Sequence, residues 1–151
     1  MARTEAAMHF VTRQRIHVDR IATAWAIRRF VDPQATFEFV PWRSDPRQIV
    51  GVPFDIRGAE LSHRGGRCTL EALISKYELT DEPLRRMARI IRAADLPQEE
   101  PAPPEAAGVL AIFDGIRDSS PTDEQRLERG FVACDALYAY CQHNRQAGTE
   151  V

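Results

Sequence analysis

Apolar and polar residues in the first third of the chain follow the short repeats typical of β-strands, interrupted by one helical stretch. Residues 9–12 are rich in β-prone side chains, residues 36–40 alternate apolar and polar, and residues 53–56 form a third short apolar run. Between the first two stretches, apolar positions recur at the spacing of one helix face. We therefore predict three strands and a helix over 20–30, with Asp19 as its N-cap.

The remaining two thirds of the chain show the longer period of amphipathic helices. Helices are predicted over residues 70–77, 80–95, 105–116 and 120 to about 143. Residues 96–104 are rich in proline, which predicts an extended linker because proline has no backbone N–H to donate. The whole pattern predicts an α/β (α+β) fold, with a small N-terminal β-sheet covered by helices and a mostly helical C-terminal half.

Length and composition favour one domain over residues 1–151, with residues 1–7 as a flexible tail. A chain of 151 residues that is 44% hydrophobic can bury a substantial core. No apolar run approaches the roughly 20 residues of a membrane span, and the start lacks the apolar region of a signal peptide. The 3 cysteines show no disulfide pattern. We expect a cytoplasmic protein without a membrane partner.

Charge argues against bulk electrostatic binding to nucleic acid. Lys and Arg number 20 and Asp and Glu 22, for a net charge of −2. All but one of the basic residues are arginine, the exception being Lys76. Arginine presents a planar fork suited to carboxylate, phosphate or another oxyanion. A GC-rich genome would explain the same preference for arginine equally well.

The segment over residues 58–71 concentrates groups that carry chemistry. It holds two glutamates, a histidine, a cysteine, two arginines and three glycines, a mixture that a hydrophobic core does not need. Glu60 and His63 have the Glu-x-x-His spacing of carboxylate-bridged metal sites. We predict a divalent metal cofactor held by Glu60, His63 and Asp95. The alternative is that Glu60 and His63 only form hydrogen bonds with loop backbone.

Arginines near this segment form a second hypothesis, a site for a small oxyanion. Arg64 is the strongest candidate because it lies between His63 and a glycine, and Arg20 and Arg28 lie on the first predicted helix. Arg28 shares a helix face with apolar residues, so its burial would require an anionic partner. Internal ion pairs with aspartates are the alternative for each arginine.

Cys68 and His17 complete the set of candidate ligand-binding residues. Cys68 precedes a predicted helix, whose N-terminal dipole would lower the thiol pKa and favour redox chemistry or capture of a soft metal. A buried, unreactive thiol is the alternative. His17 is close in sequence to Asp19 and Arg20, although it serves equally well as a residue at the end of a strand.

Several of these segments together resemble the chromate-resistance protein family, and more narrowly the C-terminal domain of the regulators encoded beside chromate efflux pumps. The resemblance covers about residues 8–143. Its most specific parts are Asp-Arg-Ile-Ala at 19–22 and Glu-Leu-Ser-His-Arg-Gly at 60–65. These two motifs lie within matching segments at 18–32 and 58–65, and the other matching segments are residues 9–13, 53–55, 68–71, 93–95 and 134–140.

The resemblance implies a sensor or binding domain for chromate resistance, which binds a metal ion, an oxyanion such as chromate, or both through residues 58–71 and regulates chromate efflux. The longer regulators carry an additional N-terminal region, so direct binding to nucleic acid is not expected of this chain. The alternative is a metal- or thiol-dependent enzyme, either a hydrolase or a chromate reductase. The sequence leaves open whether the protein is a homodimer.

Overall fold

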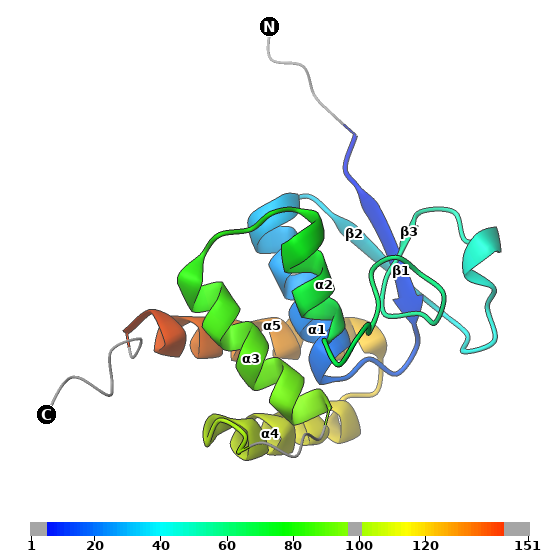
Figure 1. Ribbon diagram of the computed structural model, residues 1–151. Coiled ribbons are helices and arrows are strands. Elements are labelled where there is room, and N and C mark those ends of the chain that lie inside the picture. The colour runs from blue at the N-terminus through cyan, green and yellow to red at the C-terminus, as the bar shows by residue number, and fades with distance from the viewer. Residues whose placement is uncertain (1–5, 97–100, 144–151) are drawn as a thin grey trace, which may run out of the picture.

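A small parallel sheet and a set of helices form the structure, a computed structural model that describes residues 6–96 and 101–143 (Figure 1). The strands are β1 (His9–Arg13), β2 (Thr36–Val40) and β3 (Val52–Pro53), in the order β2-β1-β3. Both pairings are parallel because a helix connects β1 to β2 and a long loop connects β2 to β3. The central strand β1 is buried over its middle residues.

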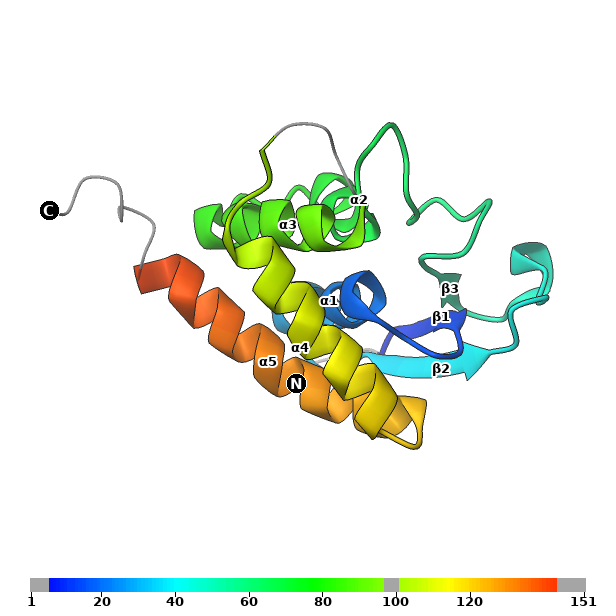
Figure 2. The ribbon, with the colours of Figure 1, turned by 90° about the horizontal axis from the view of Figure 1, so that it is seen from below.

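One helix lies at the centre of the molecule. The helices are α1 (Val18–Ala26), α2 (Thr69–Lys76), α3 (Glu82–Asp95), α4 (Glu105–Ser119) and α5 (Asp123–His143), with a π-helical turn η1 (Ile27–Val31) after α1 and a 3-10 turn η2 (Pro46–Gln48). Helix α1 packs against α2, α3 and α5 and is buried along almost its whole length (Figure 2). A helix that is buried on almost every side belongs to the core, so its neighbours are positioned by their packing against α1.

The predicted fold class is confirmed, with corrections at the ends of two elements. The third strand ends at Pro53 instead of residue 56 because Asp55 adopts a positive φ of 50°, which turns the chain away from the sheet. The first helix begins at Val18, and its N-cap is His17, so the prediction of Asp19 as N-cap is wrong. Asp19 is a buried residue inside the helix.

Some sequence predictions fall wholly or partly outside the described residues. These are most of the flexible tail predicted at the N-terminus and the centre of the proline-rich linker, because residues 1–5 and 97–100 are not described. Residues 101–103 have no regular secondary structure before α4. Among the described helices, none is both long and apolar enough to span a bilayer.

The contact between α1 and α5 predicts a stability difference between two glycine variants. A Cβ atom at Gly130 would overlap the side chain of Ile21, whereas Gly115 on α4 has open space around it. We expect Gly130→Ala to lower the free energy of unfolding by about 1–3 kcal/mol through overpacking. Gly115→Ala, the matched control, should raise it by up to about 1 kcal/mol through helix propensity. Urea denaturation measures both; equal effects would contradict this packing.

Candidate functional site

The buried carboxylate of Asp19 connects α1 to the start of α2. Its side chain is 2% exposed. Its Oδ2 accepts a hydrogen bond from the backbone N–H of Thr69 at 2.8 Å, and its Oδ1 accepts one from Leu70 at 3.1 Å. These N–H groups belong to the first turn of α2 and have no partner within the helix. Asp19 therefore caps a helix that begins 50 residues after it.

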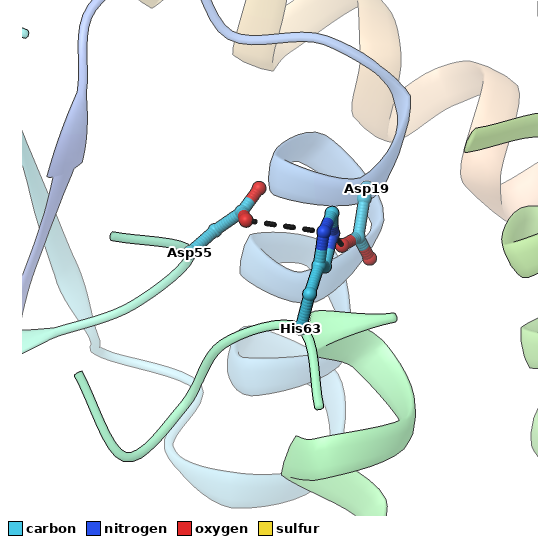
Figure 3. A group of neighbouring side chains, drawn as sticks. All are labelled: Asp19, Asp55 and His63. Carbon is cyan, nitrogen blue, oxygen red and sulfur yellow. Dashed lines mark hydrogen bonds and ion pairs between the residues drawn. The ribbon is translucent and has the colours of Figure 1, made fainter. Parts of the chain in front are cut away.

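His63 lies among three aspartates: Figure 3 shows it with Asp19 and Asp55, and Asp95 is the third. Its Nε2 is 2.8 Å from Asp19 Oδ2, 3.1 Å from Asp95 Oδ2 and 3.6 Å from Asp55 Oδ1. One ring N–H can donate only one good hydrogen bond, and the bond to Asp19 is the shortest. The carboxylates of Asp55 and Asp95 therefore face the same nitrogen atom but receive no good hydrogen bond from it.

Asp55 is brought to this cluster by an unusual backbone conformation. Its φ of 50° lies in the left-handed region, where aspartate is tolerated better than most residues. Arg20 holds the turn: its Nη2 donates to the carbonyl oxygen of Asp55 at 2.9 Å, and its Nε lies 3.5 Å from the Asp55 carboxylate. Strained residues of this kind are concentrated at functional sites.

The loop that carries His63 folds back on itself in two places. The Asp55 N–H donates to the Leu61 carbonyl at 2.6 Å, and Arg64 and Arg67 exchange backbone hydrogen bonds across a tight turn. Gly65 and Gly66 form that turn with φ values of 55° and 79°, which side chains rarely adopt. The glycines therefore close the loop and hold His63 against α1.

The electrostatics of the cluster reflect its crowding. The hydrogen bond to Asp19 raises the pKa of His63 to about 9, with support from the charges of Asp55 and Asp95. Burial raises the pKa of Asp95 to about 6, and the charges of Asp19 and Asp55 add to this shift. Burial and the Asp19 charge also raise the pKa of Asp55. Groups whose pKa values are shifted in this way by burial and by neighbouring charges are concentrated at functional sites.

The arrangement has the dimensions of a metal site. Ligand atoms of Asp19, Asp55 and His63 lie within 4.8 Å of one another, and Asp95 adds a further oxygen 3.1 Å from the histidine nitrogen. A divalent ion with bonds of about 2.1 Å separates adjacent ligand atoms by roughly 3 Å. The cluster reaches solvent mainly through His63, whose side chain is 40% exposed. Modest movements of these side chains would give an ion one nitrogen and three oxygen ligands.

Of the three metal ligands expected from the sequence, the structure brings His63 and Asp95 together but places Glu60 elsewhere. The Glu60 carboxylate is 69% exposed and lies 2.8 Å from the ammonium group of Lys76. That contact holds the pKa of Glu60 below its usual value. The Glu-x-x-His spacing joins two ligands only on a helical turn, and the described loop has no helix at these positions.

The residues expected to bind an oxyanion are dispersed. Arg20 borders the cluster, whereas the Arg28 guanidinium donates to the Ala35 carbonyl and lies over two aromatic rings. A backbone carbonyl thus fills the place in which an anionic partner was expected for Arg28. Arg64 is exposed and donates to the Ala59 carbonyl at 3.3 Å. His17 Nε2 lies 2.7 Å from the Asp114 carboxylate, toward α4.

Cys68 is the N-cap of α2, as the sequence suggested, but its thiol is fully buried. Burial raises the pKa of the Cys68 thiol, and the nearby Asp19 carboxylate raises it further. The expectation of a lowered thiol pKa is therefore wrong, because desolvation and a neighbouring negative charge outweigh the helix dipole. The alternative of a buried, unreactive cysteine describes this residue.

Sequence reasoning placed Asp19 near a possible site through Arg20 but did not assign it, or Asp55, to the metal ligands. A signal for Asp19 existed: it lies beside apolar residues on a helix that is otherwise buried, and a buried carboxylate requires partners. Cysteine is also a poor N-cap, so the start of α2 pointed to a cap from elsewhere. Asp55 had no comparable signal, because its role depends on the turn that Arg20 stabilises.

This fold, with an acidic cluster around one histidine, defines an α+β domain, and comparison with known proteins assigns the family. Residues 10–141 match the family described as "ChrB, C-terminal domain", and the chain belongs to that family. It is 36% identical over 140 residues to "Protein ChrB" of Cupriavidus metallidurans. The match covers 91% of this chain but 42% of that protein. No solved structure matches.

The pKa of His63 predicts a pH-dependent stability for the metal-free protein. The folded pKa of about 9 exceeds the ordinary value of 6.5, so the folded state binds the proton more tightly. The resulting stabilisation is complete below pH 6.5 and is lost as the pH rises through about 9. For a side chain that is 40% exposed, we expect on the order of 1 kcal/mol after allowance for solvent screening.

Urea denaturation of wild type and His63→Gln, from about pH 6 to about pH 10, measures this term. The difference in the free energy of unfolding should be largest at the acid end and should shrink at the alkaline end. His143→Gln, at the C-terminal end of α5, is the matched control and should track wild type at every pH. A constant difference for His63→Gln would contradict the assignment.

Proposed function

We propose that this domain binds a divalent cation through Asp19, Asp55, His63 and Asp95, and that it serves as a sensor domain in a chromate-resistance system. The observation that carries the metal site is the convergence of three carboxylate oxygens on one imidazole nitrogen within 3.6 Å. A protonated Nε2 cannot donate good hydrogen bonds to all three carboxylates, because it carries one N–H and faces three acceptors.

Charge balance supports a divalent ion in particular. Three carboxylates and the guanidinium of Arg20 leave two negative charges when the imidazole is neutral. A divalent cation neutralises both and uses the unprotonated Nε2 as a ligand, which is the form that metals bind. Three oxygens and one nitrogen suit Mn²⁺, Fe²⁺ or Zn²⁺ better than a soft ion, which prefers thiolates.

The family supports the regulatory part of the proposal. ChrB membership and the resemblance to chromate-responsive regulators favour a role in chromate resistance, with efflux as the regulated process. In this proposal a small oxyanion such as chromate binds near the cation, because His63 opens the cluster to solvent. Arg64 is exposed, and its guanidinium donates to the Ala59 carbonyl and interacts with the charge of Glu60. Because it is exposed and adjacent to His63 in sequence, it is the arginine proposed to receive the anion.

Reductive chemistry at a thiol has less support than binding. The three cysteines are buried and unpaired by disulfides, which fits the cytoplasm as the proposed compartment. Burial raises the pKa of Cys134 as well as that of Cys68. Thiolates are the reactive form, so neither residue is suited to donate electrons to an oxyanion at neutral pH.

Calorimetric titration of the chelator-treated protein with Mn²⁺ and with Zn²⁺ tests the metal site. Wild type should bind one ion per chain, and His63→Ala should weaken binding by tenfold or more because a direct ligand is lost. Asp95→Asn should have a similar effect, since a neutral amide is a poorer ligand than a carboxylate. The control His143→Ala, at the end of α5, should bind like wild type.

Circular dichroism confirms in parallel that each variant is folded, so that lost binding is not lost structure. If wild type binds neither ion, or if His63→Ala binds both as tightly as wild type, the metal site is refuted. Titration of chromate into the metal-loaded and metal-free proteins then tests the oxyanion: binding only to the loaded form supports the proposal, and no binding to either form refutes that part.

A further inference from the structure

A cleft that is separate from the acidic cluster lies between α2 and α3. Its volume is about 510 Å³, and its walls come from the two helices, the turn that joins them and Arg67 of the preceding loop. The floor is partly apolar, with side chains of Ile74, Leu79 and Ala88. None of the four residues of the acidic cluster lines it. A cleft of this size holds a small organic molecule.

Arginine dominates the charge of this cleft. Arg85, Arg89 and Arg92 lie at positions i, i+4 and i+7 of α3 and therefore on one face of the helix, and Arg67 adds a fourth guanidinium from the loop. Like charges at this spacing destabilise a helix unless an anion compensates them. Two glutamates, Glu71 and Glu78, also line the cleft, so it has an excess of two positive charges.

Most of these guanidinium groups are not neutralised within the described part of the chain. Arg92 is paired, with its Nη1 3.0 Å from Glu71 Oε2, but its Nε is buried without a hydrogen-bond partner. The side chains of Arg67, Arg85 and Arg89 make no ion pair with any residue in 6–96 or 101–143. Arg92 therefore has a buried donor without a partner, and the exposed guanidinium groups of Arg67, Arg85 and Arg89 are available to an anion in the same concavity.

We propose that the α2–α3 cleft binds a small organic phosphate. A phosphate monoester carries nearly two negative charges at neutral pH, which matches the excess charge of the cleft, and offers three oxygens for guanidinium groups. A bare tetrahedral ion would leave most of the 510 Å³ unfilled and would not use the apolar floor. The ligand therefore has an organic body that packs on Ile74 and Leu79.

Duplex DNA is the competing source of phosphate groups. Two features of the molecule favour the small ligand. The arginines line a concave cleft between two helices, and the chain has a net charge of −2 with a pI of about 6.1, which gives little long-range attraction for a polyanion. A cleft also desolvates a phosphate group more completely than an open helix face does, which strengthens each charge-assisted hydrogen bond.

The cleft is connected to the acidic cluster through hydrogen bonds, although the two sites are separate. Glu71, the partner of Arg92, accepts the backbone N–H of Cys68 at 3.1 Å with its other oxygen. Cys68 is the N-cap of α2, and the next two N–H groups bind Asp19. An anion that engages Arg92 would therefore act on the same helix end that Asp19 caps.

The test is calorimetric titration with AMP, ribose 5-phosphate, glycerol 3-phosphate and inorganic phosphate, each against the full chain. We expect at least one ester to bind wild type more tightly than inorganic phosphate does. The variant Arg85→Gln/Arg89→Gln should weaken that binding at least tenfold. The control Arg43→Gln/Arg57→Gln removes the same charge from exposed positions outside the cleft and should bind like wild type.

Three results would overturn the proposal. The first is no ester binding up to about 10 mM, a limit near the weakest useful affinities. The second is equal binding of inorganic phosphate and all esters, which would show that the bare ion is the ligand. The third is retardation of a duplex DNA that depends on Arg85 and Arg89 without ester binding. His63→Ala should retain ester binding, so failure of this proposal is distinguishable from failure of the metal site.

Discussion

The buried carboxylate of Asp19 is the interaction on which the rest of the structure depends. It belongs to the central helix, and it caps the first turn of α2 with both of its oxygens. It also accepts the hydrogen bond from His63 at 2.8 Å, which holds the glycine-containing loop in place. A carboxylate that is 2% exposed is tolerated only when such partners surround it. The same carboxylate therefore joins α1 to α2 and holds His63 in the cluster.

The cost of this arrangement is a concentration of negative charge. Asp55 and Asp95 lie close to Asp19, and burial together with mutual repulsion raises the pKa values of both. The imidazolium of His63 compensates part of that charge, and the surrounding carboxylates raise the pKa of His63 to about 9. In the proposed metal site, a divalent cation would displace this proton from His63. The pH dependence of stability and the proposed cation binding would then depend on the same histidine.

The α2–α3 pair carries negative charge in the acidic cluster at one end and positive charge in the cleft between the helices. The acidic cluster lies at the N-terminal end of α2 and the C-terminal end of α3, and the arginine cleft lies between the helices. Arg92 and Asp95 are one turn apart on α3, and they face the cleft and the cluster respectively. The Arg92–Glu71 pair joins the two regions at the helix end that Asp19 caps. The two proposed ligands, a cation and an anion, would therefore act on one shared helix end.

The sequence alone was sufficient to predict the helices, two of the three strands and the loop over 58–71. The signals for these elements are the spacing of hydrophobic residues and the positions of proline and glycine, and they determine backbone structure over a few neighbouring residues. It also singled out His63 and Asp95, which the structure brings together. Only the tertiary structure decided that Asp19 and Asp55 complete the cluster and that Glu60 turns toward Lys76 instead. The reason is physical: these contacts depend on the packing of α1 against α2 and on a left-handed turn, and both are set by residues distant in sequence.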